Sequence, residues 1–125
     1  MSDAKMKTTV VDTSQTPRDD DDWGSKAWPI SGEAGNSATL TLGRVVIKAG
    51  MSNPRHGHDT CDELLYLLSG EIEHYADDLE CVRMKPGDVI SIPSGVFHNA
   101  KCVGEGDAEM IVVYSTAERD FVPAE

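Results

Sequence analysis

The sequence predicts an all-β domain, either a barrel or a two-sheet sandwich. Seven short runs are rich in β-branched and aromatic residues, which is typical of strands. Turn signals built from Gly, Pro, Asp and Ser separate these runs, and no window has convincing helical periodicity. Closure into a barrel would hide the strand edges that an open sheet exposes. The expected strands are residues 39–48, 64–69, 71–75, 80–84, 88–92, 97–102 and 109–115.

The chain of 125 residues is the length of one domain, preceded by a polar arm. Residues 1–27 show no sustained periodicity, and we expect them to form a partly flexible arm. Trp23 and Trp28 are its expected anchors, because tryptophans in a polar stretch usually pack against a neighbouring surface. Residues 28–125 then form the barrel. The acidic run at residues 19–22 is expected to be solvated and flexible, with a weakly held cation as the alternative.

The charge of the chain disfavours two classes of partner. The formal net charge is −11, from 22 acidic and 11 basic side chains, so phosphate backbones and anionic lipid surfaces are repelled. No stretch approaches the ~20 apolar residues of a membrane span, and the start lacks the apolar segment of a secretory signal. Cys61, Cys81 and Cys102 lack paired spacing, which favours reduced thiols and a cytoplasmic location.

Three histidines and one glutamate predict a metal site. His56 and His58 are two residues apart, so on a strand both imidazoles point to the same face. Glu63 precedes the apolar run 64–68, where a buried carboxylate is unfavourable unless it is paired or bound to a metal. His98 lies in a separate predicted strand. Each residue alone has an ordinary structural explanation, but together they supply three neutral nitrogens and one anionic oxygen for a divalent ion.

Glycines extend this constellation into a longer pattern. Gly50, His56, His58, Glu63 and Gly70 have the spacing G-x5-H-x-H-x4-E-x6-G. This spacing resembles the first sequence motif of the cupin family at every fixed position.

A second pattern surrounds His98. Gly87, Pro93, Gly95 and His98 have the spacing G-x5-P-x-G-x2-H, which resembles the second cupin motif. The family motif continues to an asparagine, and Cys102 stands in its place. That asparagine is not a metal ligand in the family, so the difference does not affect the expected metal site.

The resemblance covers about residues 40–115 and implies both a fold and a site. The implied fold is a double-stranded β-helix, the jelly-roll barrel of a small single-domain cupin. The implied metal ligands are the four residues already named, His56, His58, Glu63 and His98. Imidazole and carboxylate suit Fe, Mn, Ni, Cu or Zn, and four ligands on an octahedral ion leave two positions open.

Three functions remain open, all with a small-molecule partner. The first is a non-haem Fe(II) dioxygenase, which the resemblance and the apolar interior positions favour. The second is a non-redox isomerase, epimerase, lyase or cyclase, in which the metal acts as a Lewis acid and Glu63 or His74 as the acid–base. The third is a metal-containing module that binds a sugar or acid without turnover. Fold alone does not decide among these functions.

Three further side chains are candidates for the same site. His74 can share the interior face and act as a proton shuttle or a partner of a ligand, with an outward-facing histidine as the alternative. Arg44 can bind a substrate carboxylate or form a surface ion pair. Cys102 can line the pocket or act as a small buried hydrophobe. The arm with its tryptophans, the C-terminal tail and the resemblance also favour a homodimer.

Overall fold

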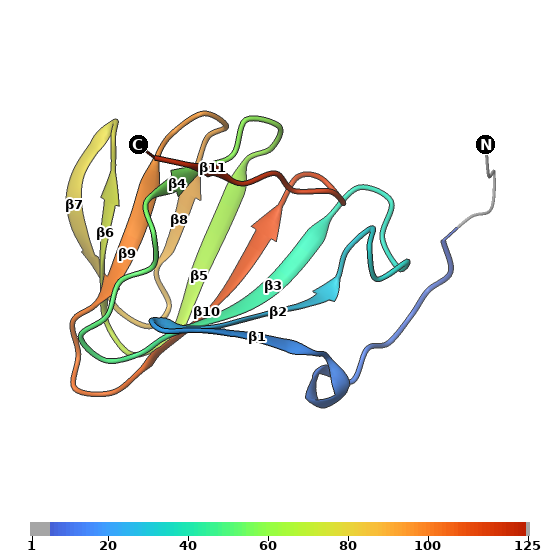
Figure 1. The fold of residues 1–125 in the computed structure, drawn as a ribbon, viewed down its shortest axis with the longest axis horizontal. Coiled ribbons are helices and arrows are strands. Elements are labelled where there is room, and N and C mark those ends of the chain that lie inside the picture. Colours follow the sequence, from blue (N-terminus) through green and yellow to red (C-terminus); the bar gives the residue numbers. More distant parts are fainter. Residues whose placement is uncertain (1–5, 125) are drawn as a thin grey trace.

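Two antiparallel sheets face each other across the interior in the computed structural model, which describes residues 6–124 (Figure 1). One sheet has the order β1 (Arg18–Asp21), β2 (Gly24–Ile30), β3 (Thr41–Ile47), β10 (Ala108–Tyr114), β5 (Glu63–Ser69) and β8 (Val89–Ile92). The other has the order β11 (Val122–Pro123), β4 (His56–Gly57), β9 (His98–Cys102), β6 (Ile72–Ala76) and β7 (Leu79–Met84). The only helix in the described residues is the single 3₁₀ turn η1 (Thr13–Gln15). The predicted all-β barrel is therefore confirmed.

All seven predicted strands are present, with ends within two residues of the expected ones. Their inward positions are the alternate apolar residues of each run, as the period of a strand requires. In β10, for example, Ala108, Met110, Val112 and Tyr114 are all at most 4% exposed. The turns that separate the strands use glycine where the backbone demands it. Gly95, with a φ of 87°, lies in the turn that leads into β9.

The core fills the space between the sheets. It is aliphatic at one end, where buried apolar side chains contribute roughly 1.5–3 kcal/mol each. The most deeply buried members there are Ile47, Leu67, Ile72 and Met110. At the other end the buried residues include four histidines and a glutamate, so the interior changes from apolar to polar along the barrel.

The boundary expected at residue 27 needs correction, because regular structure begins earlier. β1 and β2 form a hairpin, and β2 pairs with β3 in register from Gly24 opposite Ile47. Gly24 is buried there, and a Cβ atom at this position would lie 1.8 Å from the carbonyl oxygen of Val46. A strand at the edge of a sheet is half solvated, so its sequence lacks the alternation that would reveal it. Trp23 packs against the core, as an anchor should.

Most of the acidic run lies in a solvated strand. Asp19, Asp20 and Asp21 belong to β1, with Asp19 and Asp20 exposed. Arg18 lies 2.8 Å from Asp20, and Lys26 lies 3.2 Å from Asp21, so two of these carboxylates have basic partners within the hairpin.

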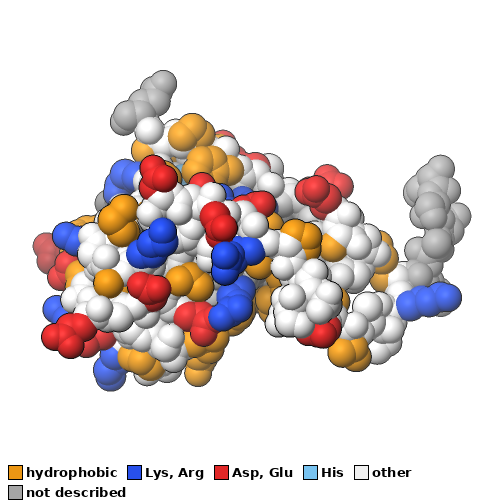
Figure 2. Space-filling model, turned by 60° about the horizontal axis from the view of Figure 1, so that its bottom comes forward, with side chains coloured by type: hydrophobic (Ala, Val, Ile, Leu, Met, Phe, Trp, Pro, Cys, Tyr) orange, Lys and Arg blue, Asp and Glu red, His pale blue; other side chains and the backbone are white. Residues whose placement is uncertain are grey.

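The surface carries both signs of charge. Figure 2 shows Lys and Arg side chains interspersed with Asp and Glu on the face that it presents, with small apolar areas between them. Among residues 6–124, no helix has the length and apolar character needed to cross a membrane.

Candidate metal centre

The strands bring His56, His58, Glu63 and His98 to one point between the two sheets. His56 begins β4, and the antiparallel pairing of β4 with β9 places it directly opposite His98. His58 follows β4, and Glu63 begins β5 in the facing sheet. All four side chains are buried, with exposed fractions of 6% or less. One ligand atom from each lies within 4.8 Å of every other, so this group can hold a metal ion.

The atoms at the centre have the spacing of neighbouring metal ligands. Nε2 of His58 and Nε2 of His98 lie 3.2 and 3.0 Å from Oε1 of Glu63. Metal–ligand bonds of about 2.1 Å at right angles would separate two ligand atoms by about 3 Å. These three atoms are buried and have no aligned hydrogen-bond partner within residues 6–124. Buried polar atoms without partners are rare, and a shared cation would satisfy all three. The residues therefore fit a divalent metal ion.

Backbone carbonyls fix the orientation of two of the ligand rings. Nδ1 of His56 lies 2.8 Å from the carbonyl oxygen of Pro54, and Nδ1 of His58 lies 2.5 Å from that of Asp120. A carbonyl only accepts, so in each ring Nδ1 carries the proton. In the neutral ring Nε2 then has a free lone pair, and in both rings it is the atom available to a metal.

His74 supports the third ring in a different way. Its Nε2 lies 3.0 Å from Nδ1 of His98, and the two ring planes are nearly parallel, with an interplanar angle of 7° and centroids 5.2 Å apart, so the rings meet edge to edge. His74 is 1% exposed, and its Nδ1 has no partner among the described residues. For Nε2 of His98 to bind a metal, its Nδ1 must donate to His74, which leaves the proton of His74 on Nδ1. His74 therefore faces inward and contacts His98, one of the four residues that could hold a metal.

The electrostatics of the cluster favour an ionised glutamate beside neutral His56 and His74. Burial alone would raise the pKa of Glu63, but the close approach of the His58 and His98 rings lowers it to about 2. Burial lowers the pKa of His56 to about 4 and does the same for His74. Burial also opposes protonation of His58, yet Glu63 and the Asp120 carbonyl raise the pKa of this ring.

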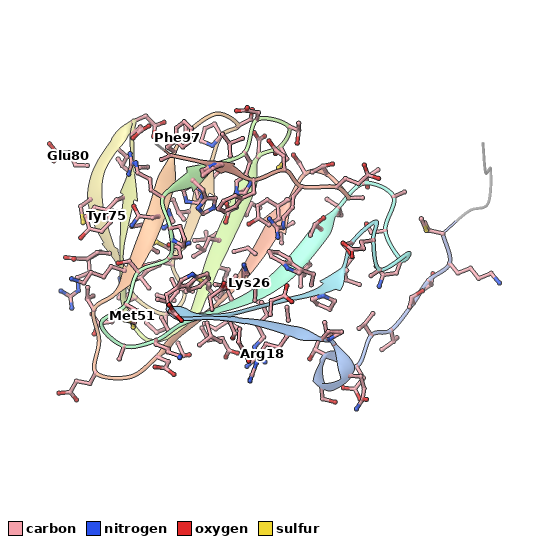
Figure 3. The ribbon with its side chains drawn as sticks, in the orientation of Figure 1. Arg18, Lys26, Met51, Tyr75, Glu80 and Phe97 are labelled. Carbon is pink, nitrogen blue, oxygen red and sulfur yellow. The ribbon has the colours of Figure 1, made fainter. Side chains whose placement is uncertain are left out.

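A cavity of about 340 Å³ adjoins this cluster. That volume lies at the small end of ligand sites, so it suits a small molecule. Its walls are mainly apolar and aromatic: Val45, Ile47, Leu65, Met110, Val112, Trp28 and Tyr114. Its charged lining outside the cluster is Asp21, Lys26 and Arg119. Figure 3 shows Lys26 near the middle of the view, where β1 and β2 lie, whereas Tyr75 and Glu80 lie at the outer β6–β7 hairpin.

The C-terminal segment completes the site. After β10 the chain crosses the top of the molecule and pairs as β11 with β4 (Figure 1). Phe121 stacks on His56 with ring centroids 4.7 Å apart. The Asp120 carboxylate accepts hydrogen bonds from the backbone of Asp59 at 2.7 Å and from the hydroxyl of Thr60 at 2.8 Å. No sequence motif placed these tail residues at the site. The one available signal was a Phe–Val pair in a polar tail.

Two predicted substrate contacts are not in the cavity. Arg44 lies on the outer face of β3, more than half exposed, in an ion pair with Glu109 of the neighbouring strand. The surface interpretation of Arg44 is therefore the correct one. Cys102 shares the inward face of β9 with His98 and Ala100, as expected, but it is fully buried in the apolar core. Its Sγ lies 3.1 Å from the carbonyl oxygen of Gly106, and it does not line the cavity.

Comparison with known proteins agrees with this fold. The cupin domain family matches residues 43–114, more than half of the chain. The chain therefore belongs to the cupin family.

Curated relatives of similar sequence include germin-like proteins. A germin-like protein, subfamily 2 member 2, of Arabidopsis thaliana is 29% identical over 85 residues, which are 65% of this chain and 39% of that protein. The chain thus spans about two fifths of the length of the curated relatives that it matches.

Similar solved structures support the fold alone. They include the polyketide cyclase RemF from Streptomyces resistomycificus, with a TM-score of 0.79, 18% identity, and coverage of 95% of this chain and 87% of RemF. KdgF from Halomonas sp. has a TM-score of 0.76, 20% identity, and coverage of 88% and 96%. Oxalate decarboxylase from Lactobacillus farciminis has a TM-score of 0.80, 16% identity, and coverage of 88% and 34%.

Proposed function

We propose that this protein is a metal-dependent enzyme that acts on a small molecule bound in the cavity. The observation that carries the proposal is the convergence of unpartnered, buried atoms of His58, Glu63 and His98, of which Glu63 and His98 line the cavity. With His56, these residues would hold one divalent transition metal ion. Such an ion would supply Lewis-acid or redox chemistry at its open positions.

The first candidate reaction is that of a dioxygenase with Fe(II). Its support is the apolar and aromatic wall of the cavity, which suits an aromatic or partly apolar substrate. Held by His56, His58, Glu63 and His98, a redox metal would supply the chemistry of dioxygen activation, and the apolar wall would bind the body of the substrate beside it.

A non-redox reaction is the second candidate, and the surroundings of the ligand set favour it. His74 and Tyr114 both line the cavity, so two side chains that can hold or move a proton lie next to the space for a substrate. The sequence had suggested a nearly apolar interior, without such groups apart from His74 and Glu63. Two structures that match this chain over most of their own length, RemF and KdgF, also have the size of a single domain, and RemF is described as a cyclase.

Metal content decides the first part of the proposal. Elemental analysis of protein purified without added metal should find about one transition metal ion per chain. Glu63→Gln and His98→Ala should lose it, because each removes a ligand atom. Glu71→Gln is a matched control, since Glu71 is half exposed and pairs only with Arg83. Full metal content in His98→Ala would show that the ligand assignment is wrong.

Reconstitution separates the two reactions. Oxygen uptake with catechols, diketones and flavonols should appear on loading with Fe or Mn if the protein is a dioxygenase. Activity with Zn, without oxygen uptake, would instead support the Lewis-acid reaction. Thermal stabilisation by a ligand without any product would point to the third function, a binding module. A homodimer and a cytoplasmic location remain predictions, and the mass of the chain in solution with and without residues 1–30 tests the first.

A further inference from the structure

The cavity contains two basic side chains, and they differ in their partners. Nζ of Lys26 lies 3.2 Å from the Asp21 carboxylate, which also lines the cavity. Arg119 has no carboxylate within ion-pair distance among residues 6–124. In a chain with twice as many acidic as basic side chains, a basic group in a cavity would be expected to have an acidic neighbour. Its absence leaves the guanidinium of Arg119 available to another anion.

Aromatic rings hold this guanidinium in place. Cζ of Arg119 lies 3.8 Å from the centroid of the Trp28 ring and 5.7 Å from that of Tyr114. Contact with a ring face satisfies the charge by a cation–π interaction and leaves the N–H groups at the guanidinium edge free to donate. Those N–H groups match the two oxygens of a carboxylate.

The same contacts place Arg119 next to the metal-ligand cluster. The Tyr114 ring lies between them, with its centroid 4.9 Å from that of His58. Arg119, His56, Glu63 and Tyr114 all line one cavity. A molecule of the size that this cavity admits can therefore reach the ligand set and the guanidinium at once.

Charge in the cavity favours an anionic occupant. Lys26 and Asp21 neutralise each other, and Glu63 supplies one negative charge against the two positive charges of a divalent ion. Arg119 adds a further positive charge. Asp19, Glu33 and Glu118 line a neighbouring pocket with it, but among residues 6–124 no carboxylate forms an ion pair with its guanidinium. In a small, mainly apolar cavity such a field attracts a negative ligand more strongly than it would in water.

We propose that Arg119 binds a carboxylate of the substrate, so that the substrate is a small organic anion with an apolar or aromatic body. This inference rests on the proposed function, because it names the class of substrate for the same cavity. The apolar wall holds the body of the molecule, and the carboxylate points to the guanidinium over Trp28. The opposite end of the molecule then faces the metal-ligand set.

Binding of simple carboxylates tests the inference without any assumed reaction. The probes are benzoate, phenylacetate and acetate, each compared with its neutral amide by calorimetry or ligand-observed NMR. Metal-free and Zn-loaded protein are both measured, so that binding to the ion and binding to Arg119 are separated. At least one carboxylate should bind metal-free protein about tenfold or more tightly than its amide, because a charge-assisted bidentate contact is lost in the amide.

Substitutions assign that preference to one side chain. Arg119→Gln and Arg119→Met should remove the preference for carboxylates over amides. Arg119→Lys should keep part of this preference, because lysine keeps the positive charge but lacks the paired N–H groups of the guanidinium. Met retains an apolar stem over Trp28, so it guards against loss of folding in the Gln variant. Arg44→Gln is the matched control, because Arg44 lies outside the cavity on the surface of β3, and it should leave the preference unchanged.

Every outcome decides the proposal. Equal binding of all three carboxylates and their amides to metal-free protein overturns it, and so does a carboxylate preference that survives in both Arg119→Gln and Arg119→Met. A preference seen only in Zn-loaded protein assigns the carboxylate to the ion and also overturns it. Failure of the proposed function looks different: the protein would take up no metal, while the carboxylate preference of Arg119 would persist.

Discussion

Replacement of His74 by phenylalanine should weaken metal binding without weakening the fold. In metal-loaded protein, Nε2 of His98 is a ligand, so its buried Nδ1–H must find an acceptor, and Nε2 of His74 at 3.0 Å supplies it. Phenylalanine fills similar space but accepts no hydrogen bond. In metal-free protein His98 can move its proton to Nε2, which lies 3.0 Å from the Glu63 carboxylate. The free-energy cost of the unpaired Nδ1–H of His98 therefore arises only in the metal-loaded protein.

The size of the effect follows from the burial of the pair. His74 and His98 are 1% and 2% exposed, so water cannot replace the missing acceptor. An orphaned buried donor costs about 1–3 kcal/mol. The expected loss of metal affinity is therefore about 10- to 100-fold, the usual range for a residue that supports a ligand.

Competition between the protein and a chromophoric chelator for Zn²⁺ measures this loss. His74→Gln is the control, because its side-chain oxygen can accept the same hydrogen bond and should restore most of the affinity. Urea unfolding of the metal-free variants should show no large loss of stability, since phenylalanine also removes the unpartnered Nδ1 of His74. Imidazole ¹⁵N shifts of the loaded wild type should place the proton of His74 on Nδ1. If His74→Phe binds Zn²⁺ as tightly as the wild type, the role assigned to His74 is wrong.

Three further predictions concern pH, the tail and the wall of the cavity. Metal-free protein should lose stability as the pH falls from 6.5 to about 4. The pKa values of His56 and His74 are near 6.5 in the unfolded chain and about 4 in the folded protein, so protons bind preferentially to the unfolded chain. Urea unfolding midpoints measured across this pH range test the prediction, and a midpoint that rises as the pH falls would contradict it. Asp120→Ala should lower the free energy of unfolding by about 1–2 kcal/mol and also weaken Zn²⁺ binding. The substitution removes the hydrogen bonds that hold Asp59 and Thr60, the residues that follow His58. Unchanged competition with the chelator would show that these hydrogen bonds do not affect metal binding. Gly43→Ala should destabilise the fold by about 1–3 kcal/mol, because the added Cβ would lie 2.3 Å from the Trp28 ring. An unaltered melting temperature would show that the Trp28 ring can move aside.

The sequence predicted the centre of the site because its ligands depend on strand parity. His56 and His58 flank a single glycine, so the period of a strand predicts that they share a face, and Glu63 begins an apolar strand in which a buried carboxylate needs a partner. His74 needed a register that one sequence does not fix, because a shift of one residue would turn it outward. The pairing of β6 with β9 sets that register by placing His74 opposite Ala100.

The cavity residues Arg119 and Trp28 could not be predicted from the sequence, because contacts between distant segments bring them together. Arg119 lies in a tail without periodicity, and Trp28 lies in a half-exposed strand that looked like part of an arm. Only tertiary packing places the guanidinium over that ring. For Arg44 the strand was well predicted and the surface ion pair is the correct one of its two interpretations, because the alternation that buries Val45 turns Arg44 outward.

The route of the C-terminal segment ties the metal site to the order in which the chain is made. His58 takes its carbonyl partner from Asp120, which is 62 residues further along, and β4 takes its strand partner from β11. A ribosome-bound chain that has emerged only as far as β10 already carries all four ligand side chains but lacks the residues that orient His58 and stack on His56. The arrangement that fits an ion is therefore complete only when the chain has been made through β11, and a chain that stops at β10 has the four side chains without the contacts that orient two of them.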